Sequence, residues 1–353
     1  MSNNVLNVLK VFGLSGIAFI VGVMLTPILT HYLYKYKLWR KEVRQLAPDG
    51  AGTPIFASMH QERETKVPRM GGILIWGVPL LLIFMFYFLS TIDGPLFDKL
   101  NFLSRNQTWL PLFTLVAASL LGLVDDLWQT LGRGNYLAGG MRFSWRLFLI
   151  IIIAVIGALW FYYQLDTRDI YIPFFDHIFI GGLFIPFFVL VMLATFSGSV
   201  IDGIDGLAGG VMAAIFGAYA GIAFFQNQID LAAFCMVVVG AIAAFLWFNI
   251  PPARFYMGET GILGLTTSIT VVAFLTDAVI VLPLIALPLV LDSASVIIQL
   301  ISKKYFGRKV FLVSPMHHHF EAIGWPAYKV TMRAWILAAV CAVLGMVIAI
   351  LGR

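Results

Sequence analysis

Ten apolar segments, each close to the length of a membrane-spanning helix, recur along this chain of 353 residues. A helix needs about 20 apolar residues to cross the hydrocarbon core of a bilayer. Hydrophobic residues make up 60% of the chain and charged residues 12%, more apolar surface than a soluble protein of this size could bury. We therefore predict an all-α integral membrane protein of about ten transmembrane helices, with residues 1–353 forming a single polytopic domain. The segments lie near residues 11–34, 71–91, 109–124, 145–165, 178–198, 207–225, 231–248, 262–276, 278–301 and 332–352.

The lysines and arginines are unequally divided between the two sides of this predicted bundle. If successive segments alternate in direction, eighteen of the 23 basic residues fall on one side and five on the other. Basic residues concentrate in cytoplasmic loops, so we expect the larger group to be cytoplasmic and both termini to be periplasmic. The first loop holds Lys35, Lys37, Arg40, Lys41, Arg44, Arg63, Lys66 and Arg69, and the smaller group is Lys10, Lys99, Arg105, Arg168 and Arg353.

The acidic and histidine residues that could support chemistry all map to the predicted cytoplasmic side. The segments were assigned from hydrophobicity alone, so this coincidence predicts one site at the cytoplasmic membrane face. Asp125 and Asp126 end the third segment, Asp202 and Asp205 follow the fifth, Glu259 precedes the eighth, and His317, His318 and His319 precede the tenth.

Each acidic motif also has a structural explanation. Asp125 and Asp126 could be solvated acids that cap a helix, although unpaired charge at a membrane boundary costs energy. Asp202 and Asp205 would share one helix face, and the dipole at a helix N-terminus explains one aspartate better than two. Glu259 lies between glycines, which alone predicts only a turn.

Five carboxylates cannot converge without a cation. Two such charges 4 Å apart repel by about 4 kcal/mol at an effective dielectric of 20. Oxygen ligands and cytoplasmic access favour Mg²⁺, which keeps waters and bridges to substrate phosphates. The histidine triplet lacks a companion cysteine, which disfavours zinc. It could be a solvated loop, or it could bind phosphate oxygens and move protons beside such a metal.

These residue types predict phosphoryl-group transfer at a membrane surface, where the bilayer supplies a hydrophobic substrate. Pro283 and Pro288 can bend the ninth helix and open a groove to lipid, although an ordinary kink explains them equally well. An ion-coupled transporter is the alternative from another class, because intramembrane acids often mark ion paths. Its acids should lie near the bilayer midplane, whereas these lie at segment ends.

The motifs resemble those of the polyprenyl-phosphate N-acetylhexosamine-1-phosphate transferases over nearly the whole chain. The histidine segment and its sequel, Gly324-Trp-Pro-Ala-Tyr-Lys329, are more similar to the pentapeptide branch than to the GlcNAc-1-phosphate branch. The resemblance rests on Met70-Gly-Gly, Leu-Val-Asp125-Asp126, Asp202-Gly-Ile-Asp205-Gly-Leu-Ala, Phe245-Leu-Trp-Phe-Asn249, Met257-Gly-Glu259-Thr-Gly and Pro315-Met-His317-His-His-Phe-Glu321.

The resemblance implies a reaction and a location. UDP-MurNAc-pentapeptide would donate phospho-MurNAc-pentapeptide to undecaprenyl phosphate in a step dependent on Mg²⁺, giving lipid I and UMP for peptidoglycan synthesis. The enzyme would lie in the bacterial inner (cytoplasmic) membrane, as a monomer or a homodimer, with no nucleic-acid partner. Direct attack by the lipid phosphate and a covalent aspartyl intermediate both fit this reaction.

The resemblance also implies roles for single residues. Asp125, Asp126, Glu259, His317 and His318 would be catalytic, with one aspartate deprotonating the lipid phosphate. Glu259 would bind the metal, with Asp125 or Asp126 as a further ligand. The substrate-binding residues would be Ser199, Asp202, Gly203, Ile204, Asp205, Asn249, Tyr256, Arg146, Lys66, Arg69 and His319.

Several positions depart from the family pattern. Glu259 stands where aspartate is usual, Ser199 where asparagine is expected, and Gln129 where a lysine commonly follows the paired aspartates. The usual lysine-rich run before Met70-Gly-Gly is reduced, so Lys66 or Arg69 would supply the missing charge. These departures keep a sister transferase open, one that uses UDP-GlcNAc or a similar sugar to start another surface glycan.

Overall fold

The computed structural model describes residues 3–41, 65–92, 95–104, 106–132 and 140–353, which are mostly helical. Arg44, Arg63, Arg105 and Arg133 of the charge analysis lie outside these residues. The elements are α1 (Asn3–Val8), a π-helical turn (Leu9–Gly13), α2 (Leu14–Lys35), α4 (Ile73–Ile92), α5 (Pro95–Leu100), α6 (Trp109–Leu131), α7 (Phe143–Gln164), β1 (Asp169–Ile172), β2 (Asp176–Phe179), α8 (Phe184–Ser197), α9 (Leu207–Phe225), α10 (Ile229–Asn249), α11 (Glu259–Leu275), α12 (Leu282–Ile285), α13 (Leu287–Phe306), α14 (Met316–Ala322) and α15 (Ala327–Leu351).

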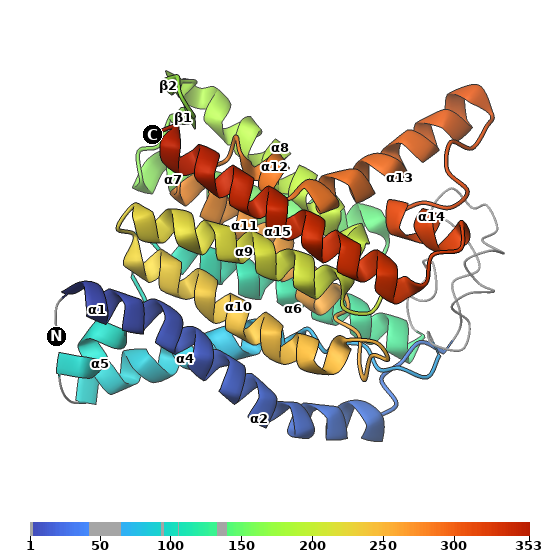
Figure 1. Cartoon of the computed structure of the whole chain (residues 1–353), viewed down its shortest axis with the longest axis horizontal. Coiled ribbons are helices and arrows are strands. Elements are labelled where there is room, and N and C mark those ends of the chain that lie inside the picture. The colour runs from blue at the N-terminus through green and yellow to red at the C-terminus, as the bar shows by residue number, and fades with distance from the viewer. Residues whose placement is uncertain (1–2, 42–64, 93–94, 105, 133–139) are drawn as a thin grey trace.

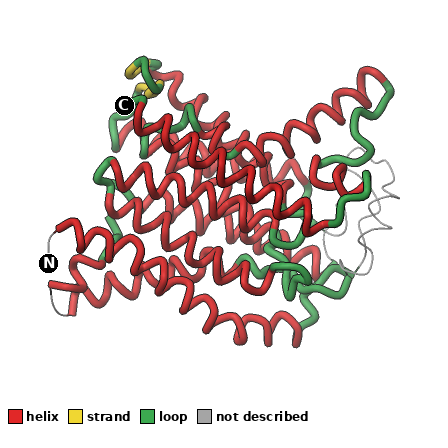
Figure 2. The backbone as a smooth tube through the Cα atoms, in the orientation of Figure 1, coloured by secondary structure: helices red, strands yellow, loops and turns green. Residues whose placement is uncertain are grey.

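Eight helices in the described residues are long and apolar enough to cross a membrane, with α1, the π-helical turn and α2 counted as one. These helices lie side by side in a bundle (Figure 1, Figure 2). Helix α1 and the last turn of α15 lie at one end of this bundle, and α14 lies at the other. The predicted multi-pass, all-α membrane architecture is confirmed.

The eighth predicted segment forms the centre of the bundle rather than a lipid-facing span. Helix α11 has 17 residues, and every residue from Thr260 to Phe274 is buried. It is rich in glycine, serine and threonine, small residues that let neighbouring helices approach closely inside a membrane. Helix α11 packs most extensively against α6. This contact brings Glu259, the first residue of α11, to the end of α6 that carries Asp125 and Asp126.

The ninth predicted segment is broken into two helices. Pro283 lies in the first turn of α12 and Pro288 in the first turn of α13. Proline is tolerated there because the first N–H groups of a helix have no partner within it. After the break at Ala286, α13 runs away from the bundle, so that its last turns stand apart from the other helices (Figure 1).

A small hairpin was not expected from the sequence. Strands β1 and β2 pair antiparallel, with Asp169 opposite Phe179. β-branched and aromatic residues on both sides of the turn favour this strand pairing. The hairpin takes residues 178 and 179 from the fifth predicted segment, and it lies at the end of the bundle opposite α14 (Figure 1).

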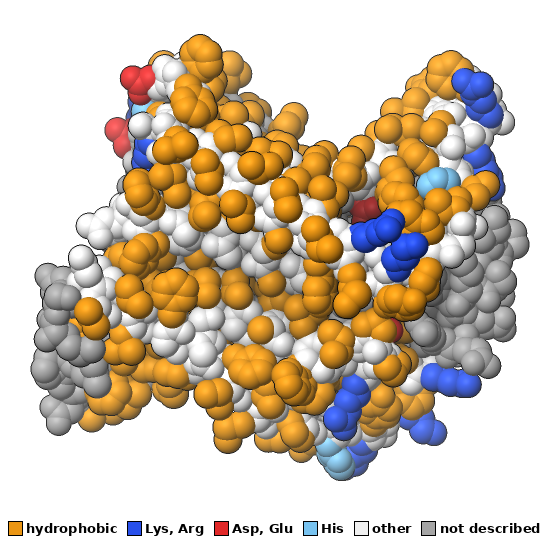
Figure 3. All heavy atoms as spheres, viewed as in Figure 1, with side chains coloured by type: hydrophobic (Ala, Val, Ile, Leu, Met, Phe, Trp, Pro, Cys, Tyr) orange, Lys and Arg blue, Asp and Glu red, His pale blue; other side chains and the backbone are white. Residues whose placement is uncertain are grey.

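The surface has the pattern of a protein embedded in lipid. Apolar side chains cover the middle of the molecule, and lysines and arginines gather at the end that carries α14 and the last turns of α13 (Figure 3). On α2, Ile20, Met24 and Ile28 recur at four-residue intervals, and all three are exposed. A stripe of large apolar residues on one face of a helix is what lipid contact requires.

Candidate active site

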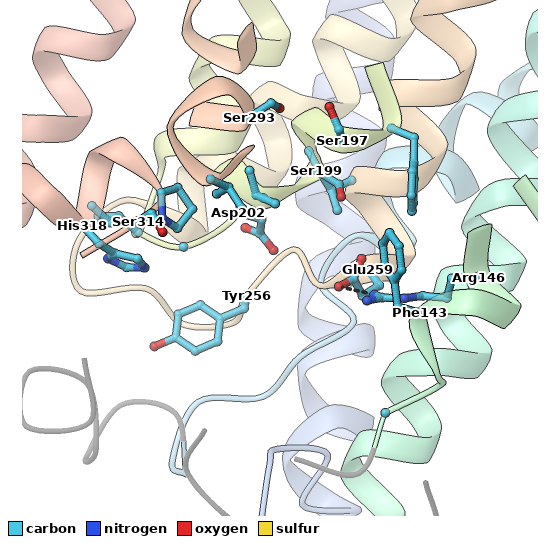
Figure 4. A pocket seen from close by; sticks show the side chains of 18 of the residues that line it. Phe143, Arg146, Ser197, Ser199, Asp202, Tyr256, Glu259, Ser293, Ser314 and His318 are labelled. Atoms are coloured by element: carbon cyan, nitrogen blue, oxygen red, sulfur yellow. Dashed lines mark ion pairs between the residues drawn. The ribbon is translucent and has the colours of Figure 1, made fainter. Parts of the chain in front are cut away.

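A cavity of about 760 Å³ lies at the α14 end of the bundle, where the predicted motifs converge. Figure 4 shows Asp202, Tyr256, Glu259, Arg146 and His318 around it, contributed by segments far apart in the chain. The predicted site residues that line the cavity are Arg69, Asp125, Arg146, Ser199, Asp202, Gly203, Ile204, Asp205, Asn249, Tyr256, Glu259 and His318. Those that do not line it are Lys66, Asp126, His317 and His319.

One guanidinium joins two of the predicted catalytic carboxylates. Arg146, in the first turn of α7, lies 3.1 Å from Asp125 and 2.8 Å from Glu259. The ion pair with Glu259 is drawn in Figure 4. Asp125 also accepts hydrogen bonds from the backbone N–H of Met141 and the side chain of Gln129. Asp125 and Glu259 therefore share a counter-ion at one wall of the cavity.

Asp126 serves a different purpose from its neighbour. It is fully buried, and its two oxygens accept hydrogen bonds from Arg69 Nε and from the backbone N–H of Thr260, each at 3.0 Å. Thr260 is the second residue of α11, whose first N–H groups lack partners within the helix. Asp126 thus joins α6 to the N-terminus of α11, where a negative charge is also favoured by the helix dipole.

Gly258 permits this close approach. Its φ of +72° is strained for residues with a side chain, and a Cβ at this position would overlap the Asp126 carboxylate. The backbone N–H of Gly258 also donates to Asp202 at 3.1 Å. The turn at Gly258 therefore holds Asp126 and Asp202 close to the start of α11, where Glu259 lies.

Of the two residues expected to supply the charge of the shortened lysine run, Arg69 reaches an acidic residue of the site. The segment Pro68–Gly71 pairs with the backbone of Tyr256, which donates to Pro68 and accepts from Gly71 at 2.8 Å each. This pairing carries Arg69 to Asp126. Lys66, the other candidate, is exposed.

Sequence reasoning did not find the partner of Gln129. Buried Arg40 donates to Gln129 Oε1 through Nε at 2.9 Å and Nη2 at 2.7 Å. Gln129 Nε2 in turn donates to Asp125 at 3.1 Å. Gln129 thus links Arg40 to Asp125 through hydrogen bonds. No local sequence signal indicates this, because 89 residues separate Arg40 from Gln129.

The loop that follows α8 is held against the loop that follows α10. Asp205 accepts a hydrogen bond from the N–H of Ala253 at 3.1 Å. Asn249 accepts from the N–H of Gly206 at 2.9 Å and donates to the carbonyl of Phe255 at 2.8 Å. Asp205 and Asn249 therefore brace two loops as well as lining the cavity.

The three histidines have different surroundings. His317 and His318 are buried, and each holds a carboxylate at 2.7 Å through Nδ1, Asp292 for His317 and Glu321 for His318. His319 turns away from the cavity, where its ring contacts Phe311 and its Nδ1 accepts from the N–H of Leu312. Asp292 was not predicted as a site residue. As the lone acidic residue of the ninth apolar segment, it carried a usable signal, since intramembrane acids are costly.

The protein itself supplies part of the cation charge that converging carboxylates require. Burial alone would lower the pKa of Arg69, but Asp126, Asp202 and Glu259 raise it overall, so this guanidinium stays charged. Burial, with the charges of Glu259 and Asp126, raises the pKa of Asp202 to about 7. Within the described ranges, no three His, Cys, Asp or Glu side chains form a group that could hold a metal ion unaided.

The fold and the site define a multi-pass membrane protein with a candidate active site at one end of its bundle. The model of the glycosyl transferase family 4 matches residues 108–277. Similar proteins extend the match to almost the whole chain. The phospho-N-acetylmuramoyl-pentapeptide-transferase of Anoxybacillus flavithermus is 34% identical over 95% of this chain and 96% of its own. Those of Bacillus subtilis and Chloroflexus aggregans are 36% and 31% identical over 94% and 96% of this chain, and over 95% and 89% of their own.

The chain therefore belongs to the phospho-N-acetylmuramoyl-pentapeptide-transferase family. It is a transferase, and the ion-coupled transporter alternative is set aside.

Proposed function

We propose that this chain transfers phospho-N-acetylmuramoyl-pentapeptide from UDP-MurNAc-pentapeptide to undecaprenyl phosphate, forming lipid I and releasing UMP. A phosphate oxygen of the lipid attacks the phosphorus that carries the sugar, and the bond from this phosphorus to the oxygen of UMP breaks. The observation that carries the proposal is the Asp125–Arg146–Glu259 cluster at the wall of the cavity. Charges held in place before the reaction stabilise phosphoryl transfer without reorganisation.

Of the two adjacent aspartates, Asp125 is the better candidate for the base. It lines the cavity, whereas Asp126 is enclosed between Arg69 and the N-terminus of α11. A general base must come within hydrogen-bond reach of the proton that it takes. Asp125 would take the proton of the lipid phosphate, and Asp126 would keep Glu259 and Arg69 in place.

The donor nucleotide would bind along the loops that follow α8 and α10. Asp202, Asp205 and Asn249 line the cavity there, together with the partly buried side chain of Tyr256. Figure 4 shows Asp202 and Tyr256 in this lining. An aromatic ring at such an edge can stack on a uracil base. Ser199 and His318 also line the cavity, on different sides of Asp202 (Figure 4).

The donor set suits Mg²⁺ bound together with a substrate diphosphate. This ion usually takes one or two protein carboxylates and completes its shell with waters and phosphate oxygens. Asp202 and Glu259 face the same cavity (Figure 4), and they are the residues that would hold it. When bound, Mg²⁺ would neutralise charge on the diphosphate. Asp202 must be ionised for this role, and Arg69 and the N–H of Gly258 both favour its ionised form.

The lipid substrate would enter beside α13. Helices α8 and α13 contribute a group of apolar side chains to the cavity wall, namely Leu193, Phe196, Val296, Ile297 and Leu300. The break at Ala286 directs α13 away from the bundle, so this wall lies next to the bilayer (Figure 1). A polyprenyl chain could therefore stay in lipid while its phosphate reaches Asp125.

The direct test offers two donors to the purified protein. UDP-MurNAc-pentapeptide or UDP-GlcNAc is mixed with undecaprenyl phosphate, and UMP release is measured with Mg²⁺ and with EDTA. We expect rapid release from the pentapeptide donor alone, loss with EDTA, and large losses in Asp125→Asn, Asp126→Asn and Glu259→Gln. Release from UDP-GlcNAc alone would instead assign the chain to the sister transferases.

The active face would be cytoplasmic in the inner membrane of a bacterium. The excess of basic residues around the α14 end supports this orientation. Both native cysteines are buried, so single cysteines introduced at Lys303 and at Asp176 can be labelled selectively in intact cells. An impermeant maleimide should label position 176 and spare position 303. The reverse pattern would contradict the orientation.

A further inference from the structure

Helix α13 contributes a buried acid that binds a histidine of α14 at two points. Asp292 Oδ2 lies 2.7 Å from His317 Nδ1, and Oδ1 accepts the backbone N–H of His317 at 3.2 Å. The side chains of Asp292 and His317 are 7% and 3% exposed. A carboxylate gripping both the ring and the backbone of one histidine leaves this ring a single orientation.

The other ring nitrogen of His317 has no hydrogen-bond partner among the described residues, although it is buried. Nearly all buried polar atoms in folded proteins have a partner, so an exception requires an explanation. A carboxylate that carries no proton can only accept hydrogen bonds. Nδ1 is therefore the protonated ring nitrogen, and it donates its hydrogen bond to Asp292. In the neutral ring, Nε2 then presents a lone pair and acts as an acceptor.

The nitrogen that carries this lone pair lies against Gly203, a residue of the cavity lining. A Cβ on Gly203 would overlap His317 Nε2 and would lie 2.9 Å from His318 Nε2. Both imidazoles therefore approach the same exposed glycine, which lies next to Asp202 in the cavity lining. The lack of a side chain at Gly203 leaves room for this approach.

We propose that Asp292 is a positioning residue for the reaction proposed above, fixing the ring of His317 so that Nε2 accepts a hydrogen bond from substrate at the Gly203 loop. The inference rests on the proposed function, which names the substrate. The substrate group that donates the hydrogen bond to Nε2 is a hydroxyl or an amide N–H of the nucleotide or of the sugar. Because Asp292 lies just after the break that directs α13 outward, it also ties the lipid-side helix to the substrate loop.

The decisive variant is Asp292→Asn, which keeps the shape of the side chain. Its amide oxygen can still accept the backbone N–H of His317, but its NH₂ group can donate to Nδ1 and so move the ring proton to Nε2. The acceptor at the cavity edge is then lost. Partners that orient metal-binding histidines typically contribute about 10- to 100-fold to metal affinity or activity, and we expect a fall in kcat/KM of comparable size here. Asp292→Glu keeps the carboxylate and should recover a large part of it.

A double-mutant cycle separates positioning from a general structural role. If Asp292 acts through His317, then Asp292→Asn should cause no further loss of kcat/KM in a His317→Ala background. Ser295→Ala is the matched control, because Ser295 is equally buried one turn later and donates only to the carbonyl of Asp292. It should leave kcat/KM unchanged. Independent, additive losses from Asp292→Asn and His317→Ala would overturn the proposal.

Binding measurements distinguish failure of this inference from failure of the proposed function. If the wild-type protein does not turn over UDP-MurNAc-pentapeptide, the proposed function fails. The affinities of the wild type, the two single variants and the double variant for UMP and for UDP-MurNAc-pentapeptide are then measured instead of kcat/KM. If the two substitutions are coupled in their effect on the affinity for both ligands, the group that donates the hydrogen bond to His317 Nε2 lies on the nucleotide. If they are coupled only for UDP-MurNAc-pentapeptide, this group lies on the sugar-peptide part. Unchanged affinities for both ligands in Asp292→Asn would overturn the inference.

Discussion

Arg146 and Glu259 form an ion pair 2.8 Å long between the first turns of two different helices, α7 and α11. The same guanidinium holds Asp125 of α6. Three helices therefore meet through one cation at the wall of the cavity. This relationship explains how a membrane protein keeps several carboxylates at one place before any substrate arrives.

Arg146→Ala should abolish turnover and destabilise the protein. Removing one partner of a buried ion pair costs up to about 3–5 kcal/mol, and somewhat less is expected here because the Arg146 side chain is 17% exposed. UMP release and the thermal unfolding midpoint in detergent measure the two effects. Arg168→Ala is the control, because its ion pair with Asp166 is largely exposed and should matter little. Normal turnover in Arg146→Ala would refute the shared counter-ion.

Gly122→Ala should separate α6 from α11. A Cβ at Gly122 would overlap the backbone of Glu259, and overpacking of this kind costs about 1–3 kcal/mol. We expect a lower unfolding midpoint together with a loss of activity, because Glu259 must move. Gly217→Ala in α9 meets open space and should be neutral or slightly stabilising, as alanine favours helix more than glycine. Equal behaviour of both variants would contradict the close contact.

Gln129→Lys should be harmful alone and tolerated with Arg40→Gln. Lysine at 129 would place an ammonium against the buried Arg40 guanidinium, which now donates twice to Gln129. In the double variant, the lysine can bind Asp125 while the shorter, neutral glutamine side chain occupies the place that the guanidinium has left. Unfolding midpoints of the two single variants and the double variant give the coupling, expected at about 0.5–3 kcal/mol. Additive changes in the unfolding midpoint would show that Arg40 and residue 129 do not act together.

Asp202 should make the substrate-free protein less stable as the pH rises from about 4 to about 7. Its pKa is raised from 3.8 to about 7 in the folded state, chiefly by burial. The folded state therefore binds a proton more tightly than the unfolded state does, so stability falls with rising pH across this interval and levels off above it. Unfolding midpoints measured against pH should show a smaller decline in Asp202→Asn. Asp166→Asn, in an exposed ion pair, is the control, and identical slopes for wild type and Asp202→Asn would contradict the assignment.

Much of the architecture follows from the order of residues along the chain. Segment length and hydrophobicity are local properties, so they indicate the apolar helices and the end of the bundle at which Asp125, Asp202, Glu259 and His317 gather. Hydrophobicity could not show that α11 is enclosed by other helices, because a buried helix and a lipid-facing helix are equally apolar. Nor could it show the hairpin, whose last two residues, 178 and 179, fall within the fifth apolar segment.

The partners of the site residues depend on packing. Asp126 pairs with Arg69, 57 residues away in the chain, and His317 pairs with Asp292, 25 residues away. Gln129 links Asp125 to Arg40, which are 85 residues apart. No periodicity encodes such pairs, because each forms only when two separate helices or loops reach the same depth in the bundle. The residue types and the side of the membrane can be predicted from the chain, whereas the choice of counter-ion for each carboxylate is made by the folded bundle.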